Sequence, residues 1–334
     1  MKRVMVTGST GFIGGALCKE LVQQGYSVRA FHRSSSNLYL LKELPVEHAI
    51  GDLSSTESLV AAMQGIDIVF HTAALLGPTT NPQEHYRVTV AGTQAVMNAA
   101  LHNKVQRVIH TSSIAALGIP SYPSEKNAPQ DSPIMNENST WNLNPNHWAY
   151  GYGKYLAELE VQNAVAQGLD VVFTNPSYVV GPGDIYRSEN SPFVQIAKGK
   201  VPFIPTGGVN VVHIEDVVSG HLAAMEYGKR GERYILGNEN LTFEKLIQKI
   251  STISQSYIPK LRVSGKIARP LANPLKLVEK IINLPVPVDM IRFAGYGFYV
   301  DNQKSIKELN LKYKHTCEDA FQDAFTWFAQ HRTI

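Results

Sequence analysis

The segment from Asn146 to Glu158, NHWAYGYGKYLAE, contains three tyrosines and a single lysine. Only Tyr150 is followed by a lysine four positions later, at Lys154. Positions i and i+4 lie on the same face of a helix, so this phenol and ammonium can come together. Such a pair can donate a proton, but it is also typical of a surface contact or of an amphipathic tyrosine at a helix start. Tyr152 and Tyr155 have no such partner, and we expect them to serve packing.

A pair of hydroxyls precedes this segment. The stretch VIHTSSIAALG, residues 108–118, reads as a strand end that carries Ser112 and Ser113. A hydroxyl in this position could polarise a carbonyl oxygen, while a phenol whose anion is stabilised by a nearby ammonium could supply the proton. The residue types therefore fit proton transfer to or from the oxygen of a carbonyl or an alcohol.

A glycine-rich segment, TGSTGFIGG at residues 7–15, lies where an apolar strand passes into a helix. Its glycines at Gly8, Gly11 and Gly14 would allow a tight turn, a close backbone approach to a pyrophosphate, and close helix-to-strand packing. A glycine triplet alone is a weak signal. Between the first strand and the first helix of an alternating chain, it predicts nucleotide binding.

The end of the second predicted strand indicates which dinucleotide is preferred. NAD-binding proteins usually place a carboxylate there for the ribose 2′-hydroxyl, but no Asp or Glu occurs between Glu20 and Glu43. Arg33 and the hydroxyls of residues 34–36 stand there instead. An arginine fork suits a 2′-phosphate, so we expect NADP(H) rather than NAD(H). The other reading is that Arg33 is merely solvated.

Composition limits the remaining classes of function. The chain has 334 residues, 44% apolar and 18% charged, with a net charge of +3. That charge is too small to indicate nucleic-acid binding over the whole surface. Two cysteines, Cys18 and Cys317, cannot form a disulfide framework, which suits a reducing compartment. The N-terminus leads directly into a predicted strand, and no apolar run approaches the roughly 18 residues that span a bilayer. We expect a cytoplasmic protein without a transmembrane segment; the scattered histidines predict no metal.

Alternating strand-like and helix-like segments predict an α/β fold with a doubly wound parallel sheet and helices on both faces. The helical segments include residues 14–25 and 89–104. We expect a dinucleotide-binding domain over 1–177, to which 208–236 returns, and over 178–334 mainly a smaller substrate lobe with closing helices. The predicted strands span residues 3–8, 27–33, 46–53, 67–74, 107–113 and 170–176.

Together, the Gly-x-x-Gly-x-x-Gly spacing, the Ser…Tyr-x-x-x-Lys arrangement and NPSYVVGPGD at residues 175–184 resemble the extended short-chain dehydrogenase/reductase superfamily, of the NAD-dependent epimerase/dehydratase type. The resemblance runs the length of the chain and implies a Rossmann sheet, a small-molecule substrate and a homodimer. It implies catalysis by Ser113, Tyr150 and Lys154, with Glu158 extending the match. It implies cofactor contacts from Gly8, Gly11, Phe12, Ile13, Gly14, Arg33, Asp52, Leu53, Thr72, Ala73, Ala74, Ser112, Tyr150, Lys154, Pro176 and Val179.

Positions at which the chain departs from the family pattern indicate which branch of the superfamily it resembles most. Sugar epimerases typically carry Arg-x-x-Asn-x-x-Gly-Pro after the sixth strand, where this chain has Asn175 and Tyr178. The 4,6-dehydratase pattern places Asp-Glu after the serine or threonine, where this chain has Ile114 and Ala115. The chain is more similar to the dihydroflavonol-reductase-like and 3β-hydroxysteroid-dehydrogenase-like reductases.

This resemblance predicts an NADPH-dependent reduction of a largely apolar ketone or aldehyde, or the reverse oxidation. The alternatives are a nucleotide-sugar 4-epimerase with tightly bound NAD and a non-catalytic dinucleotide sensor. A separate basic region, residues 260–314, fits either a solvated helical face or a site for anions or a membrane surface. The candidate substrate-contacting residues are Leu75, Leu76, Ser113, Trp148 and Tyr178, with Trp141 as a further wall of the pocket. Each of these aliphatic and aromatic residues fits core or lid packing equally well.

Overall fold

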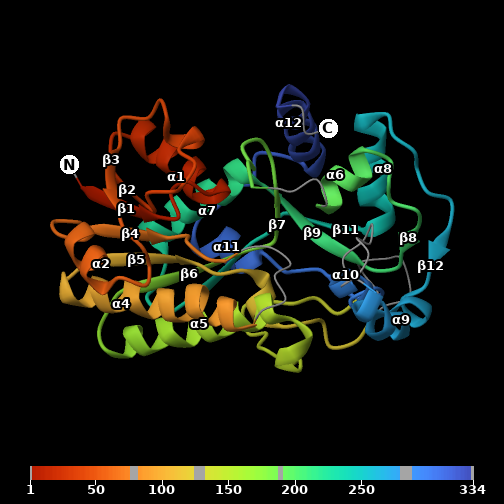
Figure 1. Ribbon diagram of the computed structural model, residues 1–334, viewed down its shortest axis with the longest axis horizontal. Coiled ribbons are helices and arrows are strands. Elements are labelled where there is room, and N and C mark those ends of the chain that lie inside the picture. The colour runs from red at the N-terminus through yellow and green to blue at the C-terminus, as the bar shows by residue number, and fades with distance from the viewer. Residues whose placement is uncertain (1, 76–81, 124–131, 187–190, 279–287, 332–334) are drawn as a thin grey trace.

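The computed structural model describes residues 2–75, 82–123, 132–186, 191–278 and 288–331. A seven-stranded sheet runs through the molecule, in the order β10-β6-β5-β4-β1-β2-β3 (Figure 1). Every neighbouring pair in this sheet is parallel. This confirms the predicted doubly wound α/β fold. The strands are β1 (Arg3–Thr7), β2 (Ser27–His32), β3 (Glu47–Ile50), β4 (Ile68–His71), β5 (Arg107–Thr111), β6 (Val171–Pro176) and β10 (Arg233–Leu236).

Both faces of this sheet are covered, which explains why central strands such as β1 are apolar on both sides. Along β1, Val4 and Val6 pack into one core together with Leu17, while Met5 packs into the other. The first face is covered by α1 (Phe12–Gln23) and α7 (Ile214–Tyr227), and the second by α2 (Thr56–Ala62), α4 (Gly92–His102) and α5 (Ala149–Ala166).

A second, four-stranded sheet lies beyond the carboxyl ends of the first (Figure 1). In it β9 pairs with β7, β11 and β13. Three helices, α6 (Pro192–Ala197), α8 (Phe243–Ser254) and α12 (Cys317–Gln330), enclose its core. A short pair, β8 (Ile204–Pro205) and β12 (Arg262–Val263), leads to α9 (Gly265–Val278) and α10 (Val288–Arg292). The four strands are β7 (Tyr178–Val180), β9 (Gly208–His213), β11 (Glu239–Thr242) and β13 (Gly297–Phe298).

The chain passes between the two sheets more than once. The predicted boundary at residue 177 falls between β6 and β7, which belong to different sheets. Within the segment 208–236, α7 and β10 lie with the large sheet, whereas β9 belongs to the small one. The helix α11 (Gln303–Glu308) also returns, because the Ser305 hydroxyl donates to the Ile235 carbonyl of β10.

The predicted helix over 89–104 contains a change of helical pitch. A π-helical turn, Tyr86–Ala91, joins α3 (Pro82–His85) to α4. Single π-turns inside helices occur frequently at functional sites. Among the described residues, none of the helices combines the length and the apolar character needed to cross a bilayer.

We predict that Leu17→Ala lowers the free energy of unfolding by about 2–5 kcal/mol, because Leu17 is fully buried between α1 and the sheet and its truncation leaves a cavity. The measurement is chemical denaturation followed by circular dichroism. Lys19→Ala, an exposed position on the same helix, is the matched control and should change stability by less than about 0.5 kcal/mol. Equal effects of the two substitutions would contradict the assigned packing.

Candidate functional site

The glycine loop lies between β1 and α1, and the space around it excludes side chains. Gly8 has a φ of 67°, and a Cβ there would lie 2.7 Å from the backbone nitrogen of Ala73. A Cβ on Gly14 would lie 2.2 Å from the carbonyl oxygen of Gly8. These two positions therefore require glycine, one for the turn and its contact with the end of β4, the other for the packing of α1 against the loop.

The start of α1 is suited to an anion. The helix begins after Gly11 without a side-chain cap and without an acidic residue in its first turn, which contains Phe12 and Ile13. Ser9 donates from its hydroxyl to the Phe31 carbonyl at 3.1 Å and so fixes the loop against the end of β2. An uncapped helix N-terminus beside a glycine turn is a phosphate-binding arrangement. The residues present fit a dinucleotide.

Arg33 directly follows β2 and is exposed. Its charge lies close enough to Asp52 to help lower the pKa of that carboxyl, although hydrogen bonds from Ser54 are the larger cause. The structure therefore brings Arg33 and Asp52 together at the carboxyl ends of β2 and β3. Next to Asp52, Leu53 contacts the start of α4, where a Cβ on Gly92 would lie 3.0 Å from it.

Ser113 and Tyr150, 37 positions apart, meet at the carboxyl edge of the large sheet. Ser113 caps a 3-10 turn, Ile114–Leu117, by accepting a hydrogen bond from the Ala115 amide at 3.1 Å. Its side chain is also close enough to the Tyr150 phenol to lower the pKa of that phenol. Burial acts more strongly in the opposite direction, so the pKa of Tyr150 is raised on balance. The phenol is therefore held in its protonated form.

The Lys154 ammonium lies one turn along α5 from Tyr150, only 4% exposed. It donates to the Thr111 carbonyl at the end of β5, with an Nζ–O distance of 2.9 Å. Burial lowers the pKa of Lys154 to about 8, and the negative charge of Glu158 opposes this shift. The three predicted catalytic residues thus lie close together at the carboxyl end of β5.

A buried carboxylate one turn further along α5 connects this region to two more strands. Glu158 is fully buried; its Oε1 accepts from the Asn175 amide at 2.7 Å and its Oε2 pairs with Arg233 at 2.6 Å. The same Asn175 amide donates to the Ser113 carbonyl at 3.0 Å. Asn175 and Arg233 were missed as supporting residues, because nothing in their local sequence indicates that they meet Glu158.

Aromatic rings surround Tyr150. His85 lies edge-on, with its ring centroid 6.1 Å from that of Tyr150, and the Trp148 ring lies at 6.4 Å. Trp148 also contacts Phe293 at 4.9 Å and Phe298 at 5.9 Å. His85, Phe293 and Phe298 were not identified from the sequence. The histidine is the last residue before the π-helical turn, a feature that only the structure reveals.

Of the two glycines that flank Tyr152, packing requires Gly151, whereas a side chain at Gly153 would make only an ordinary contact. A Cβ on Gly151 would lie 2.7 Å from the Trp148 ring, and a Cβ on Gly153 would lie 3.4 Å from the His85 Cβ. The Tyr152 and Tyr155 rings lie 5.4 and 6.1 Å from that of Trp141. Both tyrosines therefore pack, as expected. Trp141 belongs to this aromatic group and also contacts Trp148.

The other predicted site residues lie at the ends of β4, β5 and β6 and in β7. Thr72 donates from its hydroxyl to the Thr7 carbonyl at 2.7 Å, and the Leu75 amide donates to Thr89 of the π-helical turn. Ser112 is buried after β5, and Tyr178 begins β7. Leu76 lies outside the described residues. The remaining three are Ala74 after β4, Pro176 at the end of β6, and Val179 in β7.

Three buried histidines lie in or against the large sheet: His71 in β4, His110 in β5 and His221 in α7. His71 bonds through its two ring nitrogens to Thr7 at 2.7 Å and Thr93 at 3.0 Å. The Nε2 atom of His221 lies between the hydroxyls of Thr111 and Thr174, at 2.9 and 3.0 Å. The third, His110, lies with its ring 5.3 Å from that of His71. Burial lowers the pKa of all three, to about 3 for His71 and about 4 for His221.

Two groups of possible metal ligands occur among the described residues. In the first, His213, Glu215 and His315 are close together, but the Glu215 amide donates to His213 Nδ1 at 3.1 Å. That bond leaves the proton of a neutral ring on Nε2, which faces Asp323 at 3.3 Å rather than offering a lone pair. The second group consists of Glu239, Cys317 and Glu318. The expectation of no metal stays a prediction.

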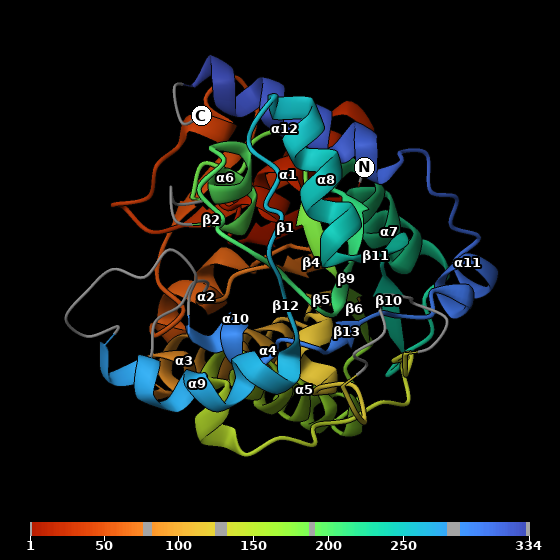
Figure 2. The same ribbon diagram turned by 90° about the vertical axis from the view of Figure 1, so that its right-hand side faces the viewer.

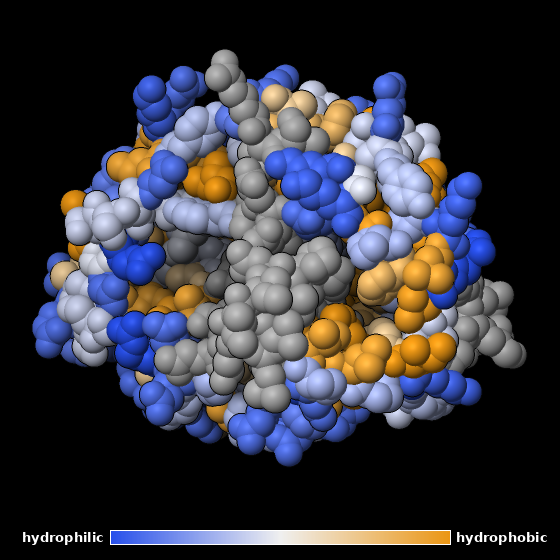
Figure 3. All heavy atoms as spheres, turned by 45° about the vertical axis from the view of Figure 1, so that its right-hand side comes forward, coloured by the Kyte–Doolittle hydropathy of each residue, from blue (hydrophilic) through white to orange (hydrophobic). Residues whose placement is uncertain are grey.

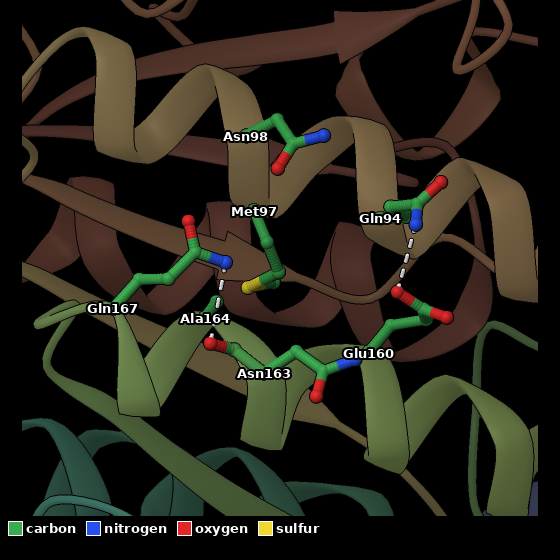
Figure 4. Close-up of a pocket in the computed structure, with 7 residues that line it drawn as sticks. All are labelled: Gln94, Met97, Asn98, Glu160, Asn163, Ala164 and Gln167. Atoms are coloured by element: carbon green, nitrogen blue, oxygen red, sulfur yellow. Dashed lines mark hydrogen bonds between the residues drawn. The ribbon is translucent and has the colours of Figure 1, made fainter.

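A hollow of about 290 Å³ lies between α4 and α5 (Figure 4). Polar side chains dominate it, and a hydrogen bond of 2.9 Å between Gln94 and Glu160 crosses it. A second hollow, of about 370 Å³, is lined largely by asparagines whose amides are engaged by backbone groups, as Asn240 and Asn302 illustrate. Neither hollow includes the predicted catalytic residues.

Comparison with known proteins identifies the family. The model of the NAD dependent epimerase/dehydratase family matches residues 4–237. The chain belongs to this family. It is 34% identical to a putative dihydroflavonol 4-reductase of Synechocystis, over 98% of this chain and 94% of the relative. It is 32% identical to sterol demethylase protein B of Methylococcus capsulatus, over 99% of both chains, and 30% identical to cinnamoyl-CoA reductase 2 of Arabidopsis thaliana, over 92% and 93%.

Solved structures agree with this assignment. The crystal structure of gox2253 has a TM-score of 0.85 and 31% identity, and each chain covers 100% of the other. A UDP-glucose 4-epimerase of Thermotoga maritima has a TM-score of 0.77 at 18% identity, over 99% of each chain, which shows a shared fold. The resemblance to the extended short-chain dehydrogenase/reductases, on their dihydroflavonol-reductase-like side, is confirmed. The chain is an oxidoreductase of an NAD(P)-dependent family.

The buried histidines predict that stability falls in acid. Because the pKa of His71 and His221 is lowered to about 3 and about 4, the unfolded chain, with a histidine pKa of about 6.5, binds more protons below that pH. The contribution of these histidines to the free energy of unfolding is therefore fully present above pH 6.5. It declines between pH 6.5 and 4, by about 1.4 kcal/mol per pH unit for each histidine.

The measurement is urea denaturation at pH 7.5, 6.5, 5.5 and 4.5. His221→Gln removes one of these protonation sites, so its stability should decline less steeply with acid than that of the unmodified chain, whatever its stability at neutral pH. His102→Gln, an exposed position, should leave the slope unchanged. The same slope in all three proteins would show that His221 is protonated equally in the folded and unfolded states.

Proposed function

We propose that the protein is an NADPH-dependent carbonyl reductase, or alcohol dehydrogenase in reverse, acting on a small and largely apolar substrate. The observation that carries the proposal is the meeting of Ser113, Tyr150 and Lys154 at the carboxyl edge of a sheet whose first strand leads into a phosphate-binding glycine loop. Relatives named as reductases, among them a cinnamoyl-CoA reductase and vestitone reductase of Medicago sativa, support it.

In this proposal the bound nicotinamide supplies a hydride to the carbonyl carbon when the substrate is reduced. Tyr150 donates its phenolic proton to the oxygen that becomes negative, and Ser113 hydrogen bonds to the same oxygen. Burial raises the pKa of Tyr150, so the proton is present on the enzyme before reaction. In the oxidation of an alcohol the same groups act in reverse, and Tyr150 must then be a phenolate.

Lys154 lowers the cost of that phenolate. With a pKa of about 8, it remains mostly protonated at neutral pH. Its ammonium is held at the Thr111 carbonyl, one helical turn from Tyr150, where its positive charge favours the Tyr150 phenolate. The ammonium also lies in the region where we expect the nicotinamide ribose to bind. Glu158, buried and paired with Arg233, keeps the ammonium charged by opposing the effect of burial.

NADP(H) is proposed over NAD(H) because Arg33 follows β2 and no carboxylate occurs between Glu20 and Glu43. The 2′-phosphate would pair with this guanidinium, while Gly8, Gly11 and the start of α1 receive the pyrophosphate. Asp52 and Leu53 are proposed to contact the adenine. Residues 72–74, Ser112, Pro176 and Val179 are proposed to border the nicotinamide half.

The substrate side is aromatic. His85, Trp148 and, behind Trp148, Phe293 and Phe298 surround Tyr150, and such rings favour an apolar or aromatic substrate over a sugar. Leu75, Leu76 and Tyr178 are proposed as further contacts. A cytoplasmic location and a homodimer, which the sequence and the family resemblance suggested, remain predictions.

The nucleotide-sugar epimerase alternative has less support. Tyr178 stands where sugar epimerases typically place the asparagine that holds the nucleotide phosphates, and the Asn175 amide is already engaged by Glu158 and Ser113. NAD that remains bound through purification, together with a thermal shift on addition of a UDP-sugar, would overturn the reductase proposal in favour of the epimerase.

We predict that Tyr150→Phe lowers kcat for NADPH-dependent reduction of an aromatic aldehyde or ketone panel by about 10²–10⁴-fold, because the proton donor is lost. Cofactor affinity, measured by titration calorimetry, should remain. Tyr152→Phe is the matched control, since Tyr152 packs against Trp141, and it should retain kcat within about twofold. Full activity of Tyr150→Phe would exclude Tyr150 as the acid.

We also predict that Arg33→Ala weakens NADPH binding by about 10–100-fold, because a charge-assisted hydrogen bond to the 2′-phosphate is lost. NADH binding should remain almost unchanged. Isothermal titration with each cofactor makes the comparison. Lys42→Ala removes an exposed charge from the loop that follows β2 and should affect neither cofactor. If Arg33→Ala weakens both cofactors equally, Arg33 does not recognise the 2′-phosphate.

A further inference from the structure

Helix α9 is packed with its small residues inward and its large apolar residues outward. Ala268 and Ala272 are buried, at 5% and 1% exposure, whereas Ile267 and Leu271 are 65% and 51% exposed. Pro270 and Pro274 are exposed on the same face, completing an i, i+3, i+4, i+7 stripe. Helices of globular proteins normally bury such a stripe, so α9 presents a surface suited to an apolar partner.

The exposed apolar surface continues along the chain that leads into α9. Tyr257, Ile258 and Leu261 are 59%, 40% and 62% exposed. Figure 2 shows this segment descending from α8 through β12 to α9, and Figure 3 shows apolar residues gathered at the lower right, over β12 and α9. We call residues 257–274 the α9 surface.

Along the sequence, residues 257–274 carry basic side chains and no acidic ones. No Asp or Glu occurs between Glu244 and Glu279, while this interval contains seven Lys or Arg residues. Two of them are engaged elsewhere, since Arg262 pairs with Glu244 and Lys249 pairs with Glu318. Lys260 and Lys266 are exposed and flank the apolar stripe. The surface therefore combines exposed apolar side chains with a positive rim.

We propose that the α9 surface docks this protein on an anionic lipid bilayer. Apolar side chains inserted among acyl chains, with lysines at the level of the headgroups, are the features of an interfacial helix. A symmetric contact between two copies would oppose Lys260 and Lys266 with the same positive region of the partner, whereas anionic lipid complements them. The charge pattern thus favours lipid over a second copy of the chain.

The α9 surface is connected to the candidate active site through the chain that follows α10. Arg269 of α9 donates to the Ala294 carbonyl at 2.7 Å, and the neighbouring Phe293 contacts Trp148, beside Tyr150. An apolar substrate dissolved in the bilayer would then be released close to the site. This consequence rests on the proposed function, but the docking itself does not.

The test is cosedimentation of the full chain with phosphatidylcholine vesicles that contain 0 or 30% phosphatidylglycerol, at 50 and 500 mM salt. We expect binding to the anionic vesicles that weakens at high salt or without phosphatidylglycerol. Ile267→Glu combined with Leu271→Glu should weaken it by about tenfold or more, because both side chains lose their apolar insertion. Lys260→Glu combined with Lys266→Glu should weaken it by about fivefold or more for each lysine.

Ile50→Glu is the matched control, because Ile50 is 67% exposed on a different part of the surface and should leave vesicle binding unchanged. Thermal unfolding verifies that each variant is folded. Failure of the unmodified chain to bind anionic vesicles, or equal binding by the α9 variants, would overturn the proposal. A dimer that Ile267→Glu combined with Leu271→Glu dissociates, without vesicle binding, would assign the surface to a second copy instead. Vesicle binding is scored without substrate or cofactor, so its failure is separate from failure of the reductase activity.

Discussion

The arrangement of the candidate site depends on keeping one buried ammonium charged. Removing a lysine from water is unfavourable unless hydrogen bonds and an opposite charge replace the solvent. Here the Lys154 ammonium donates to the Thr111 carbonyl, and Glu158 supplies the nearby negative charge. Glu158 is itself fully buried and needs partners, which Asn175 and Arg233 provide. The buried Lys154 ammonium thus requires Glu158 nearby, and Glu158 in turn requires its own hydrogen-bonding and charged partners.

This chain of partners joins α5 to three strands of the large sheet. Thr111 ends β5, Asn175 lies in β6, and Arg233 begins β10. Because the Asn175 amide also donates to the Ser113 carbonyl, the loop that carries the Ser113 hydroxyl is placed by the same carboxylate. The three residues proposed for catalysis are therefore held by buried polar groups rather than by flexible surface contacts, which suits a site that must keep its geometry during turnover.

The rest of the site is shaped by close approach. Glycines 8 and 14 let α1, the glycine loop and the end of β4 come together, and Gly151 lets the Trp148 ring lie against α5. The glycine loop and the region beside Tyr150 differ in the size of their side chains. The absence of side chains opens the glycine loop proposed to receive the pyrophosphate, while large aromatic rings fill the region beside Tyr150. A polar, anionic cofactor and an apolar substrate would find complementary surroundings.

Much of this could be read from the sequence because it depends on local patterns. Apolar runs separated by helical segments predicted the parallel sheet, and the glycine spacing between β1 and α1 predicted the loop. Tyr150 and Lys154 could be paired because a helix places i and i+4 on one face. The absence of a carboxylate after β2 was likewise visible, although whether Arg33 takes its place in binding is not a property of the sequence pattern.

What only the tertiary structure decided depends on contacts between distant segments. Nothing near Asn175, Arg233 or His85 in the chain indicates that they surround Glu158 and Tyr150, because strand order and helix packing bring them there. The same holds for α9, whose sequence shows an amphipathic pattern but not which face is buried. Sequence periodicity determines that a helix has two faces; only the neighbouring chain determines which of them is left in solvent, and here it covers the alanines and leaves Ile267 and Leu271 exposed.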